Sequence, residues 1–409
     1  MLHRLWLSFF LAAFAAALYQ WLWLDNAGIF QQLVQATFDM SALTVELAIG
    51  LIGTLAFWLG MMKLAEASGL VDKLALAVTP LFTRLMPELP KGHPAIGSMT
   101  MNLSANMLGL DNAATPLGLK AMQDLQQLNP HKHTASNAQI LFLVLNTSSV
   151  TLFPITIFLY RAQQGAADPT SVFIPILIAT SCSTLAGLLA VSLVQRINLL
   201  QRTVLLYLGG FVALLLAFIG YFSTLGADEL QRQSSLTGNL LIFSAIIGFL
   251  LLAHWRKVNV YEQFIEGAKQ GFEVAITIIP YLLAMLVAIG VLRASGALDG
   301  LIWLLREGVA ALGMDTRFAD ALPTAIMKPF SGSGARAMML ETMHSHGVDS
   351  FAAYLASVIQ GSTETTFYVL AVYFGAVGIR HTRHAIACGL TADLAGIIAA
   401  IAVGYWFFA

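Results

Sequence analysis

The chain has 409 residues, of which 58% are hydrophobic and 11% are charged, and its mean hydropathy is +0.76. Soluble domains carry about 25% charged residues, so the composition excludes an ordinary soluble protein. It predicts a polytopic membrane protein whose first partner is the lipid bilayer. The net charge of −1 gives no reason to expect nucleic acid as a partner. The two cysteines lack CxxC spacing, so we expect no disulfide framework, no metal site and no cofactor.

Nine apolar stretches are long enough to cross a bilayer. They cover residues about 5–24, 41–62, 137–160, 171–195, 203–222, 238–254, 272–292, 351–378 and 384–408. The first could be read as a cleaved signal peptide, but its length and its distal tryptophans favour a retained span. Residues 29–40 are weakly amphipathic and could lie in the membrane interface. The Lys and Arg content of the connections favours a cytoplasmic N-terminus in the inner (plasma) membrane, with the mirror-image topology left open.

Two further segments, 94–125 and 323–343, are mostly apolar but are interrupted by proline, glycine and polar residues. Irregular, polar backbone at membrane depth is tolerated only beside protein or a water-filled cavity. We therefore predict that each segment is a re-entrant hairpin.

The sequence QGSTETT at 360–366 lies in the middle of the apolar run 351–378. A carboxylate at that depth costs about 2.5–3.5 kcal/mol on insertion scales and normally faces a bundle interior or a wet cavity. Serine and threonine hydroxyls alone could simply join helices. Gln360 and Glu364 in the same cluster favour a substrate or ion site. Glu364, if unpaired in an apolar site, is a candidate proton-coupling group, and the alternative is a structural carboxylate bonded to its neighbours.

Three pairs of segments match in the same order, which indicates an internal repeat. They are ASGLVDKL at 67–74 with ASGALDGL at 294–301, NTSSVT at 146–151 with QGSTET at 360–365, and TLAGLLA at 184–190 with DLAGIIA at 393–399. The second copy starts an odd number of crossings after the first, so it should be upside down. Inverted repeats with broken helices place the transport site at the repeat interface. The predicted fold is therefore an all-α polytopic membrane protein, with about nine transmembrane helices plus two re-entrant helical hairpins in two inverted-topology repeats.

Both halves resemble a known family. The first half (55–190) resembles spore maturation protein A through GHPA at 92–95, MNLSANMLGLDNAATPLGLKAM at 101–122 and LNTSS at 145–149. The second half (275–405) resembles spore maturation protein B through SGSGAR at 331–336, SVIQGSTETTFY at 357–368 and TRHA at 382–385. Both families carry the nucleoside-recognition Gate domain, which is also similar to parts of nucleoside transporters and of the ferrous iron transporter B family.

The resemblance implies a permease-like membrane protein in which the two halves are fused. It divides the chain into an N-terminal transmembrane helix (1–28), a first Gate-type repeat (29–197), a two-helix connector (198–258) and a second Gate-type repeat (259–409). The substrate has to be argued from the site, because a fold does not fix a function.

The candidate substrate-binding residues lie in the hairpins and in the polar span centres. They are Asn106, Asp111, Asn112, Asn146, Ser148, Ser149, Ser331, Ser333, Arg336, Gln360, Ser362, Thr363, Glu364 and Thr365. Asp111 and Asn112 could instead cap a half-helix, and turn formation alone would explain the glycines of the SGSG sequence. Asp393, inside the last span, is a second coupling candidate beside Glu364. It could pair with Arg336 or with a coupling cation, H+ or Na+.

The favoured function is a secondary transporter for a small polar solute, with nucleoside-like solutes as one candidate class. We find no Walker motif and expect no enzymatic activity. The alternative is a non-transporting membrane assembly or maturation factor that acts through protein partners. A hydrolase that uses Ser333 has the weakest support, since spacing places no histidine beside it. A homo-oligomer stays open.

Overall fold

The computed structural model describes residues 2–90, 92–108, 111–311, 313 and 315–408. Side chains at positions 2–5, 51, 111–113, 227, 228, 231, 274, 275, 277, 278 and 281 are outside this description. The described backbone is helical, and its residues form no named strand.

The first half of the chain and the connector supply ten helices. They are α1 (Leu2–Trp23), α2 (Ile29–Ala67), α3 (Leu70–Leu85), α4 (Pro94–Met107), α5 (Asp111–Leu128), α6 (Asn137–Thr147), α7 (Ile155–Gln163), α8 (Phe173–Gln195), α9 (Arg202–Ser223) and α10 (Ala227–Trp255).

The second half repeats the order of the first, with a short 3-10 helix added. Its elements are α11 (Val260–Ala294), α12 (Ala297–Ala311), η1 (Arg317–Ala321), α13 (Leu322–Met327), α14 (Gly332–His346), α15 (Phe351–Ser362), α16 (Thr366–Ala376) and α17 (Ala385–Phe408).

Among the described residues, six helices are long and apolar enough to cross a membrane, namely α1, α2, α8, α9, α10 and α17. The pair α11–α12, bent by 72°, makes a seventh candidate. The chain is therefore an all-α, multi-pass membrane protein. The expected spans 137–160 and 351–378 are each divided into two short helices, so the number of nine spans stays a prediction. Residues 29–40, expected as a separate interfacial piece, are instead the first turns of the continuous helix α2.

The two halves share one local turn. The long helices α2 and α11 end at Ser68-Gly69 and Ser295-Gly296, where each serine hydroxyl donates to the carbonyl three residues earlier (2.9 and 2.7 Å). Gly69 and Gly296 have φ values of 75° and 71°, in the left-handed region that favours glycine. The repeated Ala-Ser-Gly sequence therefore redirects the chain into α3 in one half and into α12 in the other.

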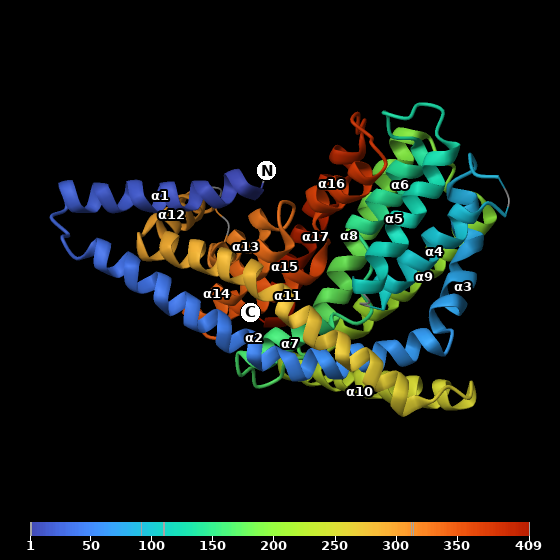
Figure 1. Ribbon diagram of the computed structural model, residues 1–409, viewed down its shortest axis with the longest axis horizontal. Helices are drawn as coiled ribbons and strands as arrows, with labels where there is room; N and C mark the ends of the chain where they lie inside the picture. The colour runs from blue at the N-terminus through green and yellow to red at the C-terminus, as the bar shows by residue number, and fades with distance from the viewer. Residues whose placement is uncertain (1, 91, 109–110, 312, 314, 409) are drawn as a thin grey trace.

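Helices α2 and α11 pack along each other and form the scaffold beneath both halves (Figure 1). They meet at small side chains: a Cβ atom added at Gly271 would lie 2.4 Å from the Cα of Ala56, and one added at Gly267 would lie 2.5 Å from the carbonyl oxygen of Leu59. Small residues four positions apart let membrane helices approach closely, which is a main source of packing energy in lipid. The spacing of Gly267 and Gly271 thus fixes where the two long helices touch.

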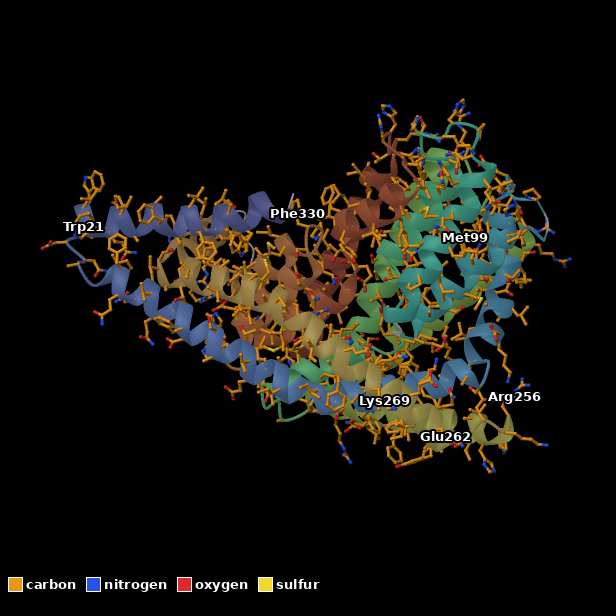
Figure 2. All side chains as sticks on the ribbon, in the orientation of Figure 1. Trp21, Met99, Arg256, Glu262, Lys269 and Phe330 are labelled. Atoms are coloured by element: carbon orange, nitrogen blue, oxygen red, sulfur yellow. The ribbon has the colours of Figure 1, made fainter. Side chains whose placement is uncertain are left out.

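The connection from α10 to α11 carries exposed charged side chains. Arg256 follows α10 and Glu262 lies in the first turn of α11, at the opposite end of the long axis from Trp21, and Lys269 lies farther along α11 (Figure 2). Basic residues beside membrane helices favour the cytoplasmic side, so this end is the one that we expect in the cytoplasm.

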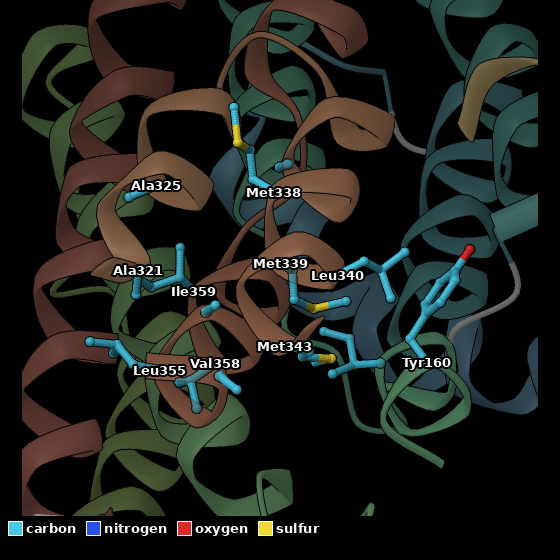
Figure 3. Close-up of a cluster of buried hydrophobic side chains, with 14 of the residues drawn as sticks. Tyr160, Ala321, Ala325, Met338, Met339, Leu340, Met343, Leu355, Val358 and Ile359 are labelled. Atoms are coloured by element: carbon cyan, nitrogen blue, oxygen red, sulfur yellow. The ribbon is translucent and has the colours of Figure 1, made fainter. Parts of the chain in front are cut away.

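A methionine-rich core holds the second hairpin (α13–α14) in place. Met338, Met339 and Met343 of α14 belong to one buried cluster with Leu355 and Ile359 of α15 (Figure 3). Methionine side chains fill irregular gaps because they are unbranched and flexible. The cluster fixes α14 against α15 immediately beside the polar residues that follow α15.

Both broken helices contact elements of both halves. α6 packs on α8 and α17, whereas α7, after the break, packs on α2 and α15. α15 packs on α14 and α17, whereas α16 packs on α5 and α6 (Figure 1). The two polar breaks therefore fall between the two halves.

Candidate functional site

Both breaks occur where polar residues replace apolar ones. α6 ends at Thr147 and α7 begins at Ile155, directly after Pro154; α15 ends at Ser362 and α16 begins at Thr366. A break leaves carbonyl groups at the end of one half-helix and N–H groups at the start of the next without intrahelical partners. Such groups are available to bind solutes, ions or each other.

The two breaks touch through their backbones. The N–H of Glu364 donates to the carbonyl oxygen of Thr147 at 2.8 Å. This bond satisfies one of the open carbonyls at the end of α6 with a donor from the other half of the chain.

Each hairpin tip is bonded to the broken helix of its own half. The N–H of Leu152 donates to the carbonyl of Met107 at 2.8 Å, and the N–H of Phe367 donates to the carbonyl of Pro329 at 2.9 Å. The rings of Phe330 and Phe367 stack with centroids 5.3 Å apart. The first hairpin (α4–α5) and the second hairpin (α13–α14) are thus held at equivalent places in the two halves.

A cavity of about 100 Å³ lies between these elements, enough for several water molecules or a small solute. Both hairpins, both breaks and α7 contribute to its wall. Its polar and charged lining residues are Asn106, Ser149, Thr151, Thr156, Tyr160, Lys328, Arg336, Gln360, Thr363 and Glu364. The cavity therefore lies at the interface of the two halves.

Six of the residues expected from sequence line this cavity. They are Asn106, Ser149, Arg336, Gln360, Thr363 and Glu364. Glu364, the first choice among them, is exposed. Arg336 places its guanidinium carbon 5.4 Å from the centroid of the Tyr160 ring.

The other expected residues with described side chains are not in the wall of the cavity. Ser148 donates its hydroxyl to the carbonyl of Val144 at 2.8 Å. Ser331 caps α14 by accepting from the N–H of Gly334 at 3.0 Å, and its hydroxyl lies 3.2 Å from that of Ser333, so the turn role accounts for both serines. The buried residues Asn146, Ser362 and Thr365 also lie outside the wall. Asp111 and Asn112 start α5, and their side chains lie outside the described residues.

Asn146 belongs to a hydrogen-bond network that positions the first hairpin. Its carboxamide oxygen accepts from Asn106 Nδ2 at 2.8 Å and from the hydroxyl of Tyr373 at 3.4 Å. Asn102 donates to the same hydroxyl at 3.3 Å and to the carbonyl of Ala114 at 2.6 Å. The network links the first hairpin, the end of α6 and α16, so it connects the two halves next to the cavity.

Lys328 is a lining residue that sequence reasoning missed. It follows α13 and is only 3% exposed, although a lysine between two broken pieces looks like part of a solvent-exposed connection. The feature of the sequence that could have shown its role is its place directly before the Pro-Phe-Ser-Gly turn of the second hairpin.

Asp393 lies on α17, beside the second break, and is 1% exposed. Both of its carboxylate oxygens lack a hydrogen-bond partner among the described residues. The hydroxyls of Thr363 and Thr366 face its carboxylate and interact with it, but not in the geometry of an ordinary hydrogen bond. The positive charge that acts on Asp393 is that of Lys328. The sequence had left Arg336 and a coupling cation open as its partner.

A buried arginine joins the end of α7 to the start of α15. Arg161 is fully buried; its Nη2 atom lies 3.2 Å from Oδ1 of Asp349, and its guanidinium carbon lies 4.3 Å from the centroid of the Tyr354 ring. A buried cation needs such partners because its desolvation is costly. This contact is a further link between the halves, outside the cavity wall.

The chain matches one family profile twice. The profile of the Gate family, described as nucleoside recognition, covers residues 48–163 and 275–380. These ranges include both hairpins, both breaks and every lining residue of the cavity. No solved structure matches the chain.

Two curated relatives from Bacillus subtilis (strain 168) are similar to parts of the chain. Spore maturation protein B is 49% identical over 158 residues, which are 39% of this chain and 87% of that protein. Spore maturation protein A is 40% identical over 162 residues, which are 40% of this chain and 83% of that protein. Each relative covers about two-fifths of the chain, which is consistent with a fusion of two such proteins. The chain therefore belongs to the Gate family of membrane proteins and is homologous to spore maturation proteins A and B.

Proposed function

We propose that the protein is a secondary transporter that holds a small polar solute in the cavity between its two halves. One observation carries the proposal: the cavity wall is shared by both breaks and both hairpins. Transporters built from inverted repeats bind solutes at the repeat interface, where broken helices present unpaired backbone groups. The opposite orientation of the two halves in the membrane is part of this proposal.

The polar groups of the cavity wall can bind a neutral or a charged polar solute. Asn106 and Gln360 offer carboxamides, Ser149 and Thr363 offer hydroxyls, and Glu364 offers a carboxylate. Carboxamides and hydroxyls can bond the hydroxyls and the base edges of a nucleoside, which agrees with the description of the family. We therefore place nucleosides first among the solutes to be tested, with coupling to H+ or to a cation.

A thermal-shift screen tests this proposal. The purified protein and its Glu364→Gln variant are heated in the presence of nucleosides, nucleobases, amino acids and cations. A ligand that binds only the folded state raises the apparent Tm. We expect a shift with at least one polar solute that is much weaker in Glu364→Gln. A shift of equal size in both proteins would place the solute away from Glu364 and contradict the proposed site.

The second candidate function is a membrane assembly factor that acts through protein partners. It is favoured by the names of both relatives, which refer to spore maturation. Under this alternative, Glu364→Gln retains full biological activity, whereas changes in the exposed connections between helices abolish it. Complementation of a deletion strain by the two sets of variants separates the alternatives.

A further inference from the structure

Four buried oxygen atoms beside the second break face one another but make no hydrogen bond of ordinary geometry among the described residues. They are both carboxylate oxygens of Asp393, Oγ1 of Thr363 and Oγ1 of Thr366. All three residues are at most 3% exposed. An unsatisfied buried polar group destabilises the folded state and a charged one does so more strongly, so four together require an explanation.

At the matching position of the first half, the polar side chain makes a hydrogen bond. Thr184 occupies the position in TLAGLLA that Asp393 occupies in DLAGIIA. The hydroxyl of Thr184 donates to the carbonyl of Ser148, just beyond the end of α6. An ionised carboxylate has no proton to donate, so Asp393 cannot make the equivalent bond to the end of α15.

The end of α15 is also close to α17. A Cβ atom added at Gly396, one turn after Asp393, would lie 3.2 Å from the carbonyl oxygen of Ser362 and 2.7 Å from Cγ2 of Thr363. Glycine at this position therefore allows α17 to approach the carbonyl end of α15. The C-terminal end of a half-helix carries partial negative charge, which adds to that of Asp393 and attracts a cation.

We propose that Asp393, Thr363 and Thr366 form a binding site for one sodium ion, at the carbonyl end of α15. Carboxylate, hydroxyl and carbonyl oxygens are ligands for hard cations. A single carboxylate among neutral oxygens suits a monovalent ion, whereas calcium sites bring together several carboxylates. Unwound carbonyls and half-helix C-termini are the groups that coordinate Na+ in broken-helix transporters. The site lies beside the solute cavity and shares Thr363 with its wall.

Two other charged groups act on the site. Lys328, from the second hairpin, attracts the carboxylate of Asp393, and Glu364 repels it. Lys328 therefore competes with the sodium ion, and Glu364 favours the ion. If the transport function proposed above holds, this sodium ion is the coupling ion.

Sodium binding is tested on the purified full-length protein without any solute. Apparent Tm and the binding of radioactive 22Na+ are measured at neutral pH, in NaCl and in choline chloride of equal ionic strength. We expect saturable binding of 22Na+ and a Tm several degrees higher in NaCl, because an ion that binds only the folded state stabilises it. Asp393→Asn and Thr363→Ala should each weaken the binding by at least tenfold.

Two further variants keep the test independent of misfolding. Asp393→Thr introduces the residue of the first half, so it should fold and lose the response to Na+. Asp124→Asn is the matched control: Asp124 is a carboxylate 3% exposed on α5, already bonded to Ser98 at 2.8 Å and to Lys120 at 2.9 Å, and its loss should leave 22Na+ binding unchanged.

Two results would overturn the proposal. One is equal 22Na+ binding by wild type and by a folded Asp393→Thr protein. The other is folded wild type that binds no 22Na+ at neutral pH, which would leave protonation as the explanation for the unpaired carboxylate. No solute takes part in this test. An absence of transport would therefore not contradict the sodium site, and an absence of sodium binding would not contradict the solute cavity.

Discussion

The N–H of Glu364 donates to the carbonyl oxygen of Thr147 across the boundary between the two halves, at a distance of 2.8 Å. These residues are more than two hundred positions apart, and each lies at the break of its own helix. The bond places the side chain of Glu364 at the cavity that both halves enclose. Movement of one half against the other must alter this contact, so it lies where alternating access would be controlled.

Glu364→Gln should leave stability almost unchanged while it weakens solute binding. The side chain is exposed and its backbone N–H, which makes the bond to Thr147, is retained. Surface changes of this kind usually alter stability by less than about 0.5 kcal/mol. Isothermal titration with the solute found in the screen should show affinity at least tenfold lower. Unchanged affinity in a folded variant would remove Glu364 from the site.

Gly267→Ala should destabilise the protein by about 1–3 kcal/mol, as overpacking does. The new methyl group would lie 2.5 Å from the carbonyl oxygen of Leu59, so α2 and α11 would have to separate. Gly308→Ala on α12 is the matched control, because no atom lies within 4 Å of its added Cβ. That change should be neutral or stabilise by up to about 1 kcal/mol. Equal effects of the two changes, measured by denaturant unfolding in detergent, would contradict the close approach.

Asp349→Ala should destabilise the protein by about 1–3 kcal/mol, since it removes the carboxylate, itself 39% exposed, that pairs with the buried Arg161. The double variant Arg161→Met with Asp349→Ala should be more stable than Asp349→Ala alone, because it leaves no buried charge without its partner. Thermal unfolding of the three proteins measures this difference. A double variant less stable than the single one would mean that the arginine stabilises mainly through packing.

Asp168, in the connection from α7 to α8, should stabilise the protein in a pH-dependent way. Burial alone would raise the pKa of Asp168, but hydrogen bonds from Ser235, Thr170 and Asn239 outweigh it and hold the pKa below the ordinary value of 3.8. A depressed pKa means that the stabilisation is present above pH 3.8 and is lost as the pH falls through the folded-state value.

The comparison of wild type with Asp168→Asn measures this effect. Wild type should have the higher apparent Tm at pH 6, and the difference should shrink steadily below pH about 4. A difference that does not vary with pH would show that the carboxylate charge has no part in it.

The hairpins could be predicted from sequence because their signals are local, whereas the two breaks were expected only as polar centres of continuous spans. Polar residues inside apolar runs mark both breaks, and the glycines and prolines of 94–125 and 323–343 mark both hairpins. The Ala-Ser-Gly match was also informative, since the turn that it makes depends only on neighbouring residues.

The parts that sequence missed depend on contacts between distant segments. The role of Gly267 and Gly271 becomes visible only when α2 lies against them. Lys328 resembles a connection residue until the second hairpin buries it. The prediction of a separate interfacial piece at 29–40 was wrong. A weakly amphipathic start does not end a helix that continues without proline to Ala67.

Uptake into reconstituted vesicles tests the central claim most directly. The wild-type protein, Glu364→Gln and the control Asp124→Asn are placed in liposomes, and the labelled solute found in the screen is added outside with a sodium or proton gradient. We predict accumulation by wild type and by Asp124→Asn well beyond the amount that the protein can bind, and almost none by Glu364→Gln. Solute that binds to folded wild-type protein but never accumulates, under either gradient, would contradict transport and favour the role in membrane assembly.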